Sequence, residues 1–250
     1  MSPPKRRDSP TAQYGADAPG VIIALVGSGI AAFAMGATAW VMVSNHWLAI
    51  AGLLLGFASL VPLGLGLSMV AYTAGGKHRL RNWLLAQHDW KGDEIVLDIG
   101  AGRGLMAIGA AQSVPRGRVV AIDIWRSEDL SGNGAAALLA NASLEGVKDR
   151  IEIRTEDARA ITLEDASVDI VLSVLCIHNI EPAIERERAL SEIIRVLKPG
   201  GRALIADYTA VPSYVRFFRN AGMMVNGPIG CHRIAWTLMS LVDVRKPETQ

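Results

Sequence analysis

The chain has 250 residues, with 25 lysines and arginines against 24 acidic residues, and half of it is hydrophobic although only 6% is aromatic. A net charge of +1 gives no electrostatic argument for binding nucleic acid. Two cysteines without a CxxC pair argue against a disulfide framework and a zinc site, so no metal is expected.

The apolar excess lies between Val21 and Tyr72, where the chain contains no Asp, Glu, Lys or Arg. Val21–Val43 and Trp47–Tyr72 each exceed the roughly 20 residues that a helix needs to cross the hydrocarbon core of a bilayer. Only three residues separate them, so we predict two transmembrane helices in a tight hairpin over residues 21–72. A signal peptide would explain the first run but not the second, and a buried pair of soluble helices is the other alternative.

The flanks of this region predict its orientation. Residues 1–20 are expected to form a disordered, proline-rich tail. Basic residues precede the first helix and follow the second, whereas the turn between them has neither Lys nor Arg; they are Lys5, Arg6, Arg7, Lys77, Arg79 and Arg81. The positive-inside rule then puts both ends in the cytoplasm, as expected for an integral protein of the cytoplasmic membrane.

Small residues recur at four-residue spacing within the predicted hairpin. They are Ala24, Ser28, Ala32 and Gly36 in the first helix, and Gly52 and Gly56 in the second. Such rows let two helix backbones approach closely. Glycine and alanine are also common in membrane helices generally, which is the plainer interpretation.

Residues 73–250 have the pattern of an α/β domain. After an amphipathic helix over His78–His88, apolar runs bounded by glycine alternate with helical stretches, which is typical of a doubly wound parallel sheet covered on both faces. The predicted strands are Glu94–Ile99, Arg118–Asp123, Ile151–Thr155, Val168–Val174 and Arg202–Asp207, and the helices are Leu105–Ser113, Ala135–Glu145 and Ala183–Leu197.

The C-terminal part has a different pattern. A helix is predicted over Tyr214–Ala221. Two strand-like runs, Met223–Asn226 and Ala235–Val244, then follow with no helix predicted between them. Two consecutive strands can pair directly, so we expect an antiparallel edge to the sheet.

The first strand leads into the sequence Asp98-Ile-Gly-Ala-Gly-Arg-Gly104. Gly100, Gly102 and Gly104 permit a sharp turn and a close approach of backbone to ligand, and the helix that follows offers unpaired N–H groups. Asp123 ends the next strand, where a carboxylate can accept both hydroxyls of a ribose. The alternative is a tight turn that binds nothing.

The spacing G-x-G-x-G differs from the G-x-G-x-x-G of nicotinamide-binding folds. Asp98, immediately before the glycines, would repel a pyrophosphate. S-adenosylmethionine contains no phosphate, and its ammonium group is a suitable partner for Asp98. The motif therefore favours S-adenosylmethionine as the cofactor, with a nicotinamide oxidoreductase as a distant alternative.

The chain from about Gly92 to Asp207 resembles the class I S-adenosylmethionine-dependent methyltransferases, and within them the ubiquinone/menaquinone-biosynthesis-like branch that acts on small molecules. Besides Asp123 and residues 100–104, which we call the glycine loop, the resemblance rests on three motifs. They are Glu156-Asp157-Ala158, Val168–Ser173 and Val196–Arg202. It implies a Rossmann-like seven-stranded sheet of order 3-2-1-4-5-7-6 with an antiparallel seventh strand. The hairpin and a long loop over Ser127–Gly134 depart from the family pattern.

The resemblance also implies residue roles. The three glycines wrap the methionine part of the cofactor, and Asp123 holds its ribose. The adenine is flanked by Ile124 and Trp125, its amino group faces Asp157, and Ala158 donates a backbone hydrogen bond. Ser173 to Cys176 line the reactive end.

Two candidate catalytic residues follow strands at the carboxyl edge of the sheet, where ligands of such folds bind. His178 is the candidate general base, needed only if the acceptor must lose a proton; it could instead cap a helix or bind a loop carbonyl. Tyr208 could contact the acceptor or simply pack. An apolar set is either an acceptor pocket or ordinary core: Tyr214, Phe217, Phe218, Met223 and Met224.

These observations predict a membrane-anchored methyltransferase that acts on a small, hydrophobic or lipid-like acceptor. Two alternatives remain open: a methyltransferase of a soluble acceptor that uses the hairpin only as an anchor, and a cofactor-binding membrane protein without catalysis. The expected partners are the acceptor and the membrane, and nucleic acid is not among them. The sequence names neither the acceptor atom nor the oligomeric state.

Overall fold

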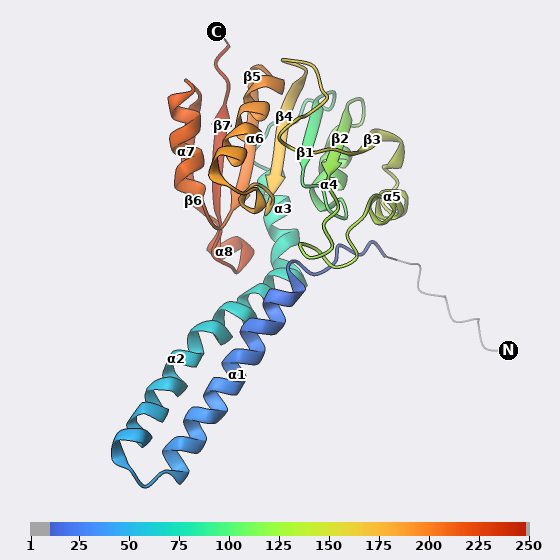
Figure 1. The fold of residues 1–250 in the computed structure, drawn as a ribbon. Helices are drawn as coiled ribbons and strands as arrows, with labels where there is room; N and C mark the ends of the chain where they lie inside the picture. The colour runs from blue at the N-terminus through green and yellow to red at the C-terminus, as the bar shows by residue number, and fades with distance from the viewer. Residues whose placement is uncertain (1–10, 249–250) are drawn as a thin grey trace, which may run out of the picture.

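The computed structural model describes residues 11–248 and has two parts (Figure 1). Two long apolar helices, α1 (Pro19–Met42) and α2 (His46–Ala71), run antiparallel and project from an α/β domain. Asn45, in the turn between them, caps the N-terminus of α2. Its side chain accepts hydrogen bonds from the N–H groups of Trp47 and Leu48, at 3.0 and 3.2 Å. The predicted helical hairpin is therefore present, and both helices are long and apolar enough to cross a membrane.

Small residues bring α1 and α2 together. A Cβ added to Gly36 would lie 2.5 Å from the carbonyl oxygen of Gly52, and one added to Gly52 would lie 2.6 Å from the Cβ of Ala39. The contact surface therefore has no room for another carbon at these two positions. Ala24 and Ser28 of the predicted row are exposed instead, because the contact continues through Gly29, which lies against Leu63.

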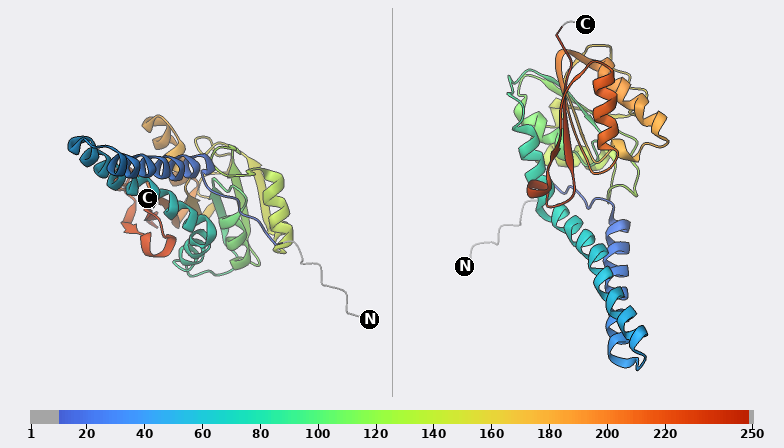
Figure 2. Two further views of the ribbon diagram at one scale, coloured as in Figure 1. Left: turned by 90° about the horizontal axis from the view of Figure 1, so that it is seen from below. Right: turned by 90° about the vertical axis from the view of Figure 1, so that its left-hand side faces the viewer.

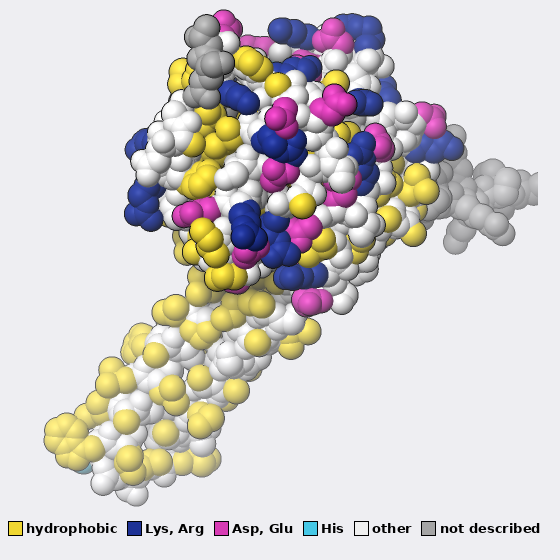
Figure 3. All heavy atoms as spheres, turned by 45° about the horizontal axis from the view of Figure 1, so that its top comes forward, with side chains coloured by type: hydrophobic (Ala, Val, Ile, Leu, Met, Phe, Trp, Pro, Cys, Tyr) yellow, Lys and Arg dark blue, Asp and Glu magenta, His cyan; other side chains and the backbone are white. Residues whose placement is uncertain are grey.

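The outer surface of the hairpin is almost entirely apolar. Figure 3 shows hydrophobic side chains along its length with no Lys, Arg, Asp or Glu, whereas the surface of the α/β domain mixes both charges. Large side chains such as Ile23, Trp40 and Leu54 are more than half exposed. An apolar surface of this size is not stable in water without a covering, and it suits contact with lipid.

The second apolar helix runs on into the α/β domain. After α2 a single π-helical turn, η1 (Tyr72–Gly76), leads into α3 (Lys77–Leu85), so that His46–Leu85 forms one continuous helix. Leu80 and Leu84 of α3 are buried in the domain core. This helix is the predicted amphipathic helix, and it ends at Leu85 rather than at His88.

The sheet has the expected seven strands in the order β3-β2-β1-β4-β5-β7-β6. The first five strands are parallel and β7 is antiparallel to both of its neighbours. The strands are β1 (Ile95–Ile99), β2 (Arg118–Asp123), β3 (Ile151–Thr155), β4 (Val168–Val174), β5 (Leu197–Asp207), β6 (Met224–Gly230) and β7 (Ser240–Arg245).

Helices cover both faces of the sheet (Figure 2). They are α4 (Leu105–Ser113), α5 (Ala135–Leu144), α6 (Ala183–Val196) and α7 (Val211–Asn220), with a single-turn helix α8 (His232–Ala235) and two short 3-10 turns, η2 (Lys148–Arg150) and η3 (Ile177–Asn179). Adjacent strand residues alternate between the two cores, as Val96 and Leu97 do in β1. Helix α8 corrects the expectation that no helix separates the last two strands.

The apolar set considered for an acceptor pocket belongs mostly to the core. Tyr214, Phe218 and Met223 are buried among residues of α6, β5 and β7. Phe217 packs against the same core, while Met224 is exposed on the edge strand. Helix α7 lays its apolar face on the sheet, in agreement with the core interpretation.

Part of the predicted disordered tail is ordered in the structure. Residues 1–10 lie outside the described residues, but residues 12–18, which we call the strap, run extended over the domain before α1 begins at Pro19. Hydrogen bonds hold the strap at several points; for example, Gln13 and Asn141 pair through two bonds of 2.9 Å. These contacts are long-range, which is why local composition did not reveal them.

The close contact at Gly36 generates a stability prediction. Gly36→Ala should lower the resistance of the hairpin to SDS, because overpacking costs about 1–3 kcal/mol. Gly27→Ala is the matched control on the same helix, since a Cβ there meets nothing within 4 Å. Far-UV circular dichroism in an SDS titration measures both. Equal midpoints for the two variants would contradict the observed packing.

Candidate functional site

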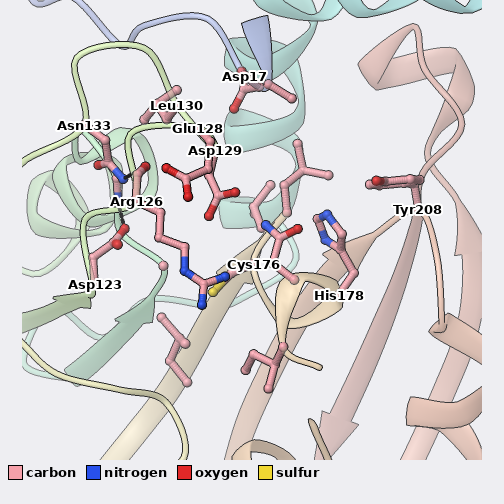
Figure 4. Close-up of a pocket in the computed structure, with 18 of the residues that line it drawn as sticks. Asp17, Asp123, Arg126, Glu128, Asp129, Leu130, Asn133, Cys176, His178 and Tyr208 are labelled. Carbon is pink, nitrogen blue, oxygen red and sulfur yellow. Dashed lines mark hydrogen bonds between the residues drawn. The ribbon is translucent and has the colours of Figure 1, made fainter. Parts of the chain in front are cut away.

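A cavity of about 720 Å³ opens at the carboxyl edge of the parallel strands, on the side from which the hairpin projects (Figure 4). Its wall combines three regions. One is the glycine loop with the end of β2, the second is the loop after β4 with Tyr208, and the third is the domain-proximal end of the hairpin. The hairpin residues of the wall are Val21, Leu25, Leu65, Ser68, Met69 and Tyr72.

The glycine loop has the backbone geometry that only glycine adopts readily. Gly100, Gly102 and Gly104 have φ values of +74°, +54° and +88°. A Cβ on Gly100 would collide with Cys176, and one on Gly102 would lie 2.8 Å from Leu130. Gly100 and Gly102 line the cavity, whereas Gly104 starts α4 and packs against the core, so its role is to permit the turn.

Asp123 lies at the carboxyl end of β2 and faces the cavity. One of its carboxylate oxygens accepts a hydrogen bond from the N–H of Gly102 at 2.7 Å, and the other accepts from the N–H of Trp125 at 2.6 Å. Each oxygen keeps further lone-pair capacity for a ligand. The carboxylate thus fixes the glycine loop at the place where the sequence puts a ribose.

The two residues predicted to flank the adenine separate in the structure. Ile124 lines the cavity with its side chain half exposed. Trp125 does not line it, because a left-handed backbone at φ +58° turns the side chain away and its indole N–H donates to Thr155 Oγ1 at 2.8 Å. The structure therefore does not support Trp125 as an adenine contact and retains Ile124.

Asp98 is buried beneath the glycine loop and is not part of the cavity wall. Burial raises the pKa of its carboxyl to about 7, and the nearby Asp123 charge adds to the increase, against a hydrogen bond from the N–H of Ala107. Its Oδ2 has no hydrogen-bond partner. An unpartnered buried oxygen at this point is suited to a cationic group that enters from the cavity.

Ser173 is also behind the wall. Its side chain is buried and its hydroxyl donates to the carbonyl oxygen of Ile99 at 3.2 Å. The residues after it, Val174, Leu175 and Cys176, do line the cavity. Burial raises the pKa of the Cys176 thiol well above its usual value, so Cys176 has no character of a nucleophile.

Asp157 and Ala158 line the cavity beside β3, where the sequence puts the adenine. Hydrogen bonds from the Arg159 guanidinium, the shorter at 2.6 Å, lower the pKa of the Asp157 carboxyl. The carboxylate is therefore ionised near neutral pH and available as an acceptor.

The charge of the wall fits a cationic ligand. Among the described residues that line the cavity, seven are carboxylates and only two are guanidiniums: Asp17, Asp123, Glu128, Asp129, Glu156, Asp157 and Glu181 against Arg126 and Arg159. S-adenosylmethionine carries a sulfonium, an ammonium and a carboxylate, and so one net positive charge. The glycine geometry, the unpartnered oxygen of Asp98 and this acidic wall all fit that cofactor.

His178 and Tyr208 lie together at the other side of the cavity (Figure 4). Their rings meet edge to face with centroids 4.6 Å apart. Nδ1 of His178 lies 2.6 Å from Oδ1 of the buried Asp207, close but out of hydrogen-bond alignment. Asp207 also accepts from the N–H of His178 at 3.1 Å and from the hydroxyl of Tyr214 at 3.2 Å. The hydrogen bond to Asp207 therefore holds the backbone of His178, and it leaves the carboxylate beside the ring.

Several residues of the wall were missed by the sequence analysis. Asp17 comes from the strap, Arg126 and Asp129 come from the loop after β2, and the hairpin adds its own apolar residues. The unusual length of the Ser127–Gly134 loop was a signal that this region departs from the family. No local pattern indicated that the first helix would begin at the cavity.

The comparisons with known proteins agree with this geometry. Residues 97–205 match the family model described as a methyltransferase domain. Over 143 residues the chain is 28% identical to the ubiquinone/menaquinone biosynthesis C-methyltransferase UbiE of Dinoroseobacter shibae, covering 56% of this chain and 53% of that protein. It is 31% identical over 148 residues to the demethylmenaquinone methyltransferase of Symbiobacterium thermophilum, covering 59% and 55%.

The chain spans about half the length of these curated relatives. Another relative, the arsenite methyltransferase of Halobacterium salinarum, is 32% identical over 115 residues, which cover 46% of this chain and 27% of that protein. Among solved structures, an S-adenosylmethionine-dependent methyltransferase from Aquifex aeolicus superposes with a TM-score of 0.54 at 21% identity, covering 68% of this chain and 93% of its own. At that identity the match supports the fold alone.

The position of Asp123 generates a binding prediction. Asp123→Ala should weaken binding of S-adenosylmethionine at least tenfold, because hydrogen bonds to a carboxylate contribute about 1.5–3 kcal/mol each and about 1.4 kcal/mol is tenfold. Titration calorimetry on the folded variant measures this. Asp149→Ala, an exposed site far along the chain from the glycine loop, is the control. Unchanged affinity in Asp123→Ala would remove the assignment.

Proposed function

The chain belongs to the class I S-adenosylmethionine-dependent methyltransferases, in the branch similar to the ubiquinone/menaquinone C-methyltransferases, and from this premise we propose that it methylates a small hydrophobic or lipid-like acceptor at a membrane surface. The observation that carries the proposal is the single cavity that the glycine loop shares with the hairpin. The donor site and the apolar helices line one space.

The two ends of that cavity differ in chemistry. The end at β2 and β3 is acidic, with Asp123 and Asp157, and suits the cationic cofactor. The end at the hairpin is apolar, with Val21, Leu65 and Met69. An acceptor with apolar character would place that part against the helices and its reacting atom between His178 and the glycine loop.

When bound, S-adenosylmethionine would supply an electrophilic methyl group, activated by the positively charged sulfur, for transfer to an electron pair of the acceptor. Residues of the chain need to bind and orient both reactants, which by itself lowers the barrier. We propose that Asp98 and the glycine loop hold the amino-acid part of the cofactor, Asp123 its ribose, and Ile124, Asp157 and Ala158 its adenine.

The proposed general base is His178. With Nδ1 against Asp207, Nε2 is the nitrogen left to receive a proton from an acceptor that loses one on methylation. Asp207 would stabilise the resulting imidazolium, in the role that a buried carboxylate has beside a catalytic histidine. Tyr208, half exposed beside the ring, would contact the acceptor.

We also propose that the hairpin spans the cytoplasmic membrane with the methyltransferase domain on the cytoplasmic side. Three observations support this. Both helices have the required length and apolar surface, basic residues flank the domain side only, and Asn45 caps a turn without Lys or Arg at the far end. The domain would then sit at the level of the lipid headgroups, with the cavity turned toward the bilayer.

A pair of adjacent substitutions tests whether the acceptor uses the hairpin end of the cavity. Met69→Trp fills that end, whereas Val70→Trp places the same indole on the outer surface of α2, where Val70 is 44% exposed. With labelled methyl donor and a lipid extract of the host membrane as the acceptor pool, Met69→Trp should lower the rate of label transfer about tenfold or more. Val70→Trp should leave the rate near that of the wild type.

The donor site serves as the internal reference. Both variants should bind S-adenosylmethionine with wild-type affinity, because position 69 lies on α2 and is not among the residues assigned to the cofactor. Equal transfer rates for the two variants would contradict the hydrophobic-acceptor proposal. The soluble-acceptor alternative, in which the hairpin is only an anchor, would then account better for the fold.

A further inference from the structure

The strap lies between the membrane hairpin and the cofactor site. It pairs with the loop after β2, residues 126–134, which we call the cap loop. The N–H of Ala18 donates to the carbonyl oxygen of Asp129 at 2.8 Å, and the N–H of Ser131 donates to the carbonyl oxygen of Ala16 at 2.9 Å. The hydroxyl oxygen of Ser131 accepts from the N–H of Ala16 at 2.7 Å. The two segments thus form one antiparallel β-bridge, between Asp17 and Leu130.

The strap is also fixed to the glycine loop. The buried side chain of Asn141 donates to the carbonyl oxygens of Gln13 and of Arg103, both at 2.9 Å, and accepts from the N–H of Gln13. Arg103 is the residue between Gly102 and Gly104. One amide therefore joins the strap to the turn that the cofactor is expected to contact.

A buried ammonium group ties the strap to the second helix. Lys77, at the start of α3, is only 3% exposed. Its ammonium donates to the carbonyl oxygens of Tyr14, at 3.0 Å, and of Gly15, and lies 3.4 Å from the carboxylate of Asp17. A buried cation is stable only when its hydrogen-bonding capacity is used, so the strap carbonyls and Lys77 depend on each other.

Side-chain packing continues these contacts to the cavity wall. A Cβ added to Gly15 would lie 2.6 Å from the carbonyl oxygen of Ser131, 3.1 Å from Leu130 and 3.2 Å from Arg103. Leu130 in turn packs on Gly102, where an added Cβ would lie 2.8 Å from its side chain. A continuous series of contacts therefore runs from the strap through the cap loop to the glycine loop.

We propose that the strap, held by Lys77, is a wall of the methyl-donor site, and that it positions the cap loop over the bound cofactor. Asp17 and Ala18 line the cavity directly, and Asp129 and Leu130 line it through the cap loop. The hairpin is then a structural part of cofactor binding as well as an anchor. This inference rests on the proposed function, because it assigns a further element to the same donor site.

Two departures from the family pattern are explained by the contact between the strap and the cap loop. The cap loop is longer than the family's, and the hairpin is an addition. The strap, which leads directly into the hairpin, and the cap loop form the two sides of the Asp17–Leu130 bridge, so the longer loop has its partner in the segment that precedes α1. Lys77 is a positioning residue in this scheme, since it touches the strap and not the cavity.

Two glycines of this region give a matched test in full-length protein in lipid nanodiscs. Gly15→Ala puts a Cβ at a backbone of φ +68° and against Ser131, whereas Gly20→Ala puts one where nothing lies within 4 Å. Gly15→Ala should raise the calorimetric Kd for S-adenosylmethionine at least tenfold. It should also speed tryptic cleavage after the exposed Arg126 of the cap loop at least fivefold. Gly20→Ala should change neither measurement.

Ser131→Ala is a milder variant, which replaces Gly15→Ala in the test if Gly15→Ala does not have the native circular dichroism spectrum. It removes one hydrogen-bond acceptor between the strap and the cap loop. Ser191→Ala, whose exposed hydroxyl donates to the carbonyl oxygen of Glu187 in α6, is its control. Ser131→Ala should raise Kd and the cleavage rate about threefold relative to Ser191→Ala. If Gly15→Ala folds and changes neither the Kd for S-adenosylmethionine nor the cleavage rate after Arg126, the inference is overturned. If Gly15→Ala does not fold, the same result for Ser131→Ala overturns it.

Failure of the proposed function gives a different result. A wild-type protein that binds no S-adenosylmethionine would contradict the donor-site assignment itself. The cleavage rate after Arg126 would still decide whether the strap orders the cap loop, because proteolysis needs no cofactor. Weaker cofactor binding with an unchanged cleavage rate would contradict the positioning role of the strap.

Discussion

The continuous helix from His46 to Leu85 is the constraint on which the arrangement of this protein depends. Its first part packs against α1 through small residues, and its last turns bury Leu80 and Leu84 in the α/β core. Where helix η1 passes the domain, a Cβ on Gly76 would collide with the carbonyl group of Ala235. A rigid connection of this kind holds the carboxyl edge of the sheet, and therefore the cofactor site, against the hairpin. A flexible linker would leave the two parts independent.

This placement gives the cavity its two chemical characters. The parallel sheet supplies the polar end, because loops at the carboxyl ends of its strands bring Asp123 and Asp157 to one side, as in other doubly wound folds. The hairpin adds apolar residues to the wall, among them Met69. Methyl transfer depends on the relative orientation of donor and acceptor, and one wall shared by the sheet loops and the hairpin is suited to orient both.

Sequence analysis predicted the features that local patterns determine. Strands Arg118–Asp123, Ile151–Thr155 and Val168–Val174 agree with the structure because alternating or continuous apolar runs bounded by glycine are local signals. The sheet order came from the family resemblance and is confirmed. In the site, one cavity brings together five residues to which the sequence assigned roles: Asp123, Ile124, Asp157, Ala158 and His178.

What the sequence did not predict depends on long-range contacts. The strap looked like a proline-rich tail, because its partners Ser131 and Asn141 lie more than a hundred residues further along the chain. Trp125 was expected at the adenine, but its left-handed backbone and its bond to Thr155 turn it away. Apolar side chains such as Tyr214 and Phe218 occur both in acceptor pockets and in cores, so their sequence does not separate the two cases. The packing of α7 on the sheet shows that these two belong to the core.

We propose that the donor site faces a bilayer which the hairpin crosses, and the side on which the hairpin turn emerges tests this most directly. Single cysteines at Asn45, in the turn, and at Lys148, an exposed site of the domain, can be introduced after replacing Cys176 and Cys231. An impermeant maleimide should label position 45 only from outside intact cells and position 148 only in inside-out vesicles. Labelling of both positions from the same side would show that the hairpin does not span, and the membrane-facing site would be contradicted.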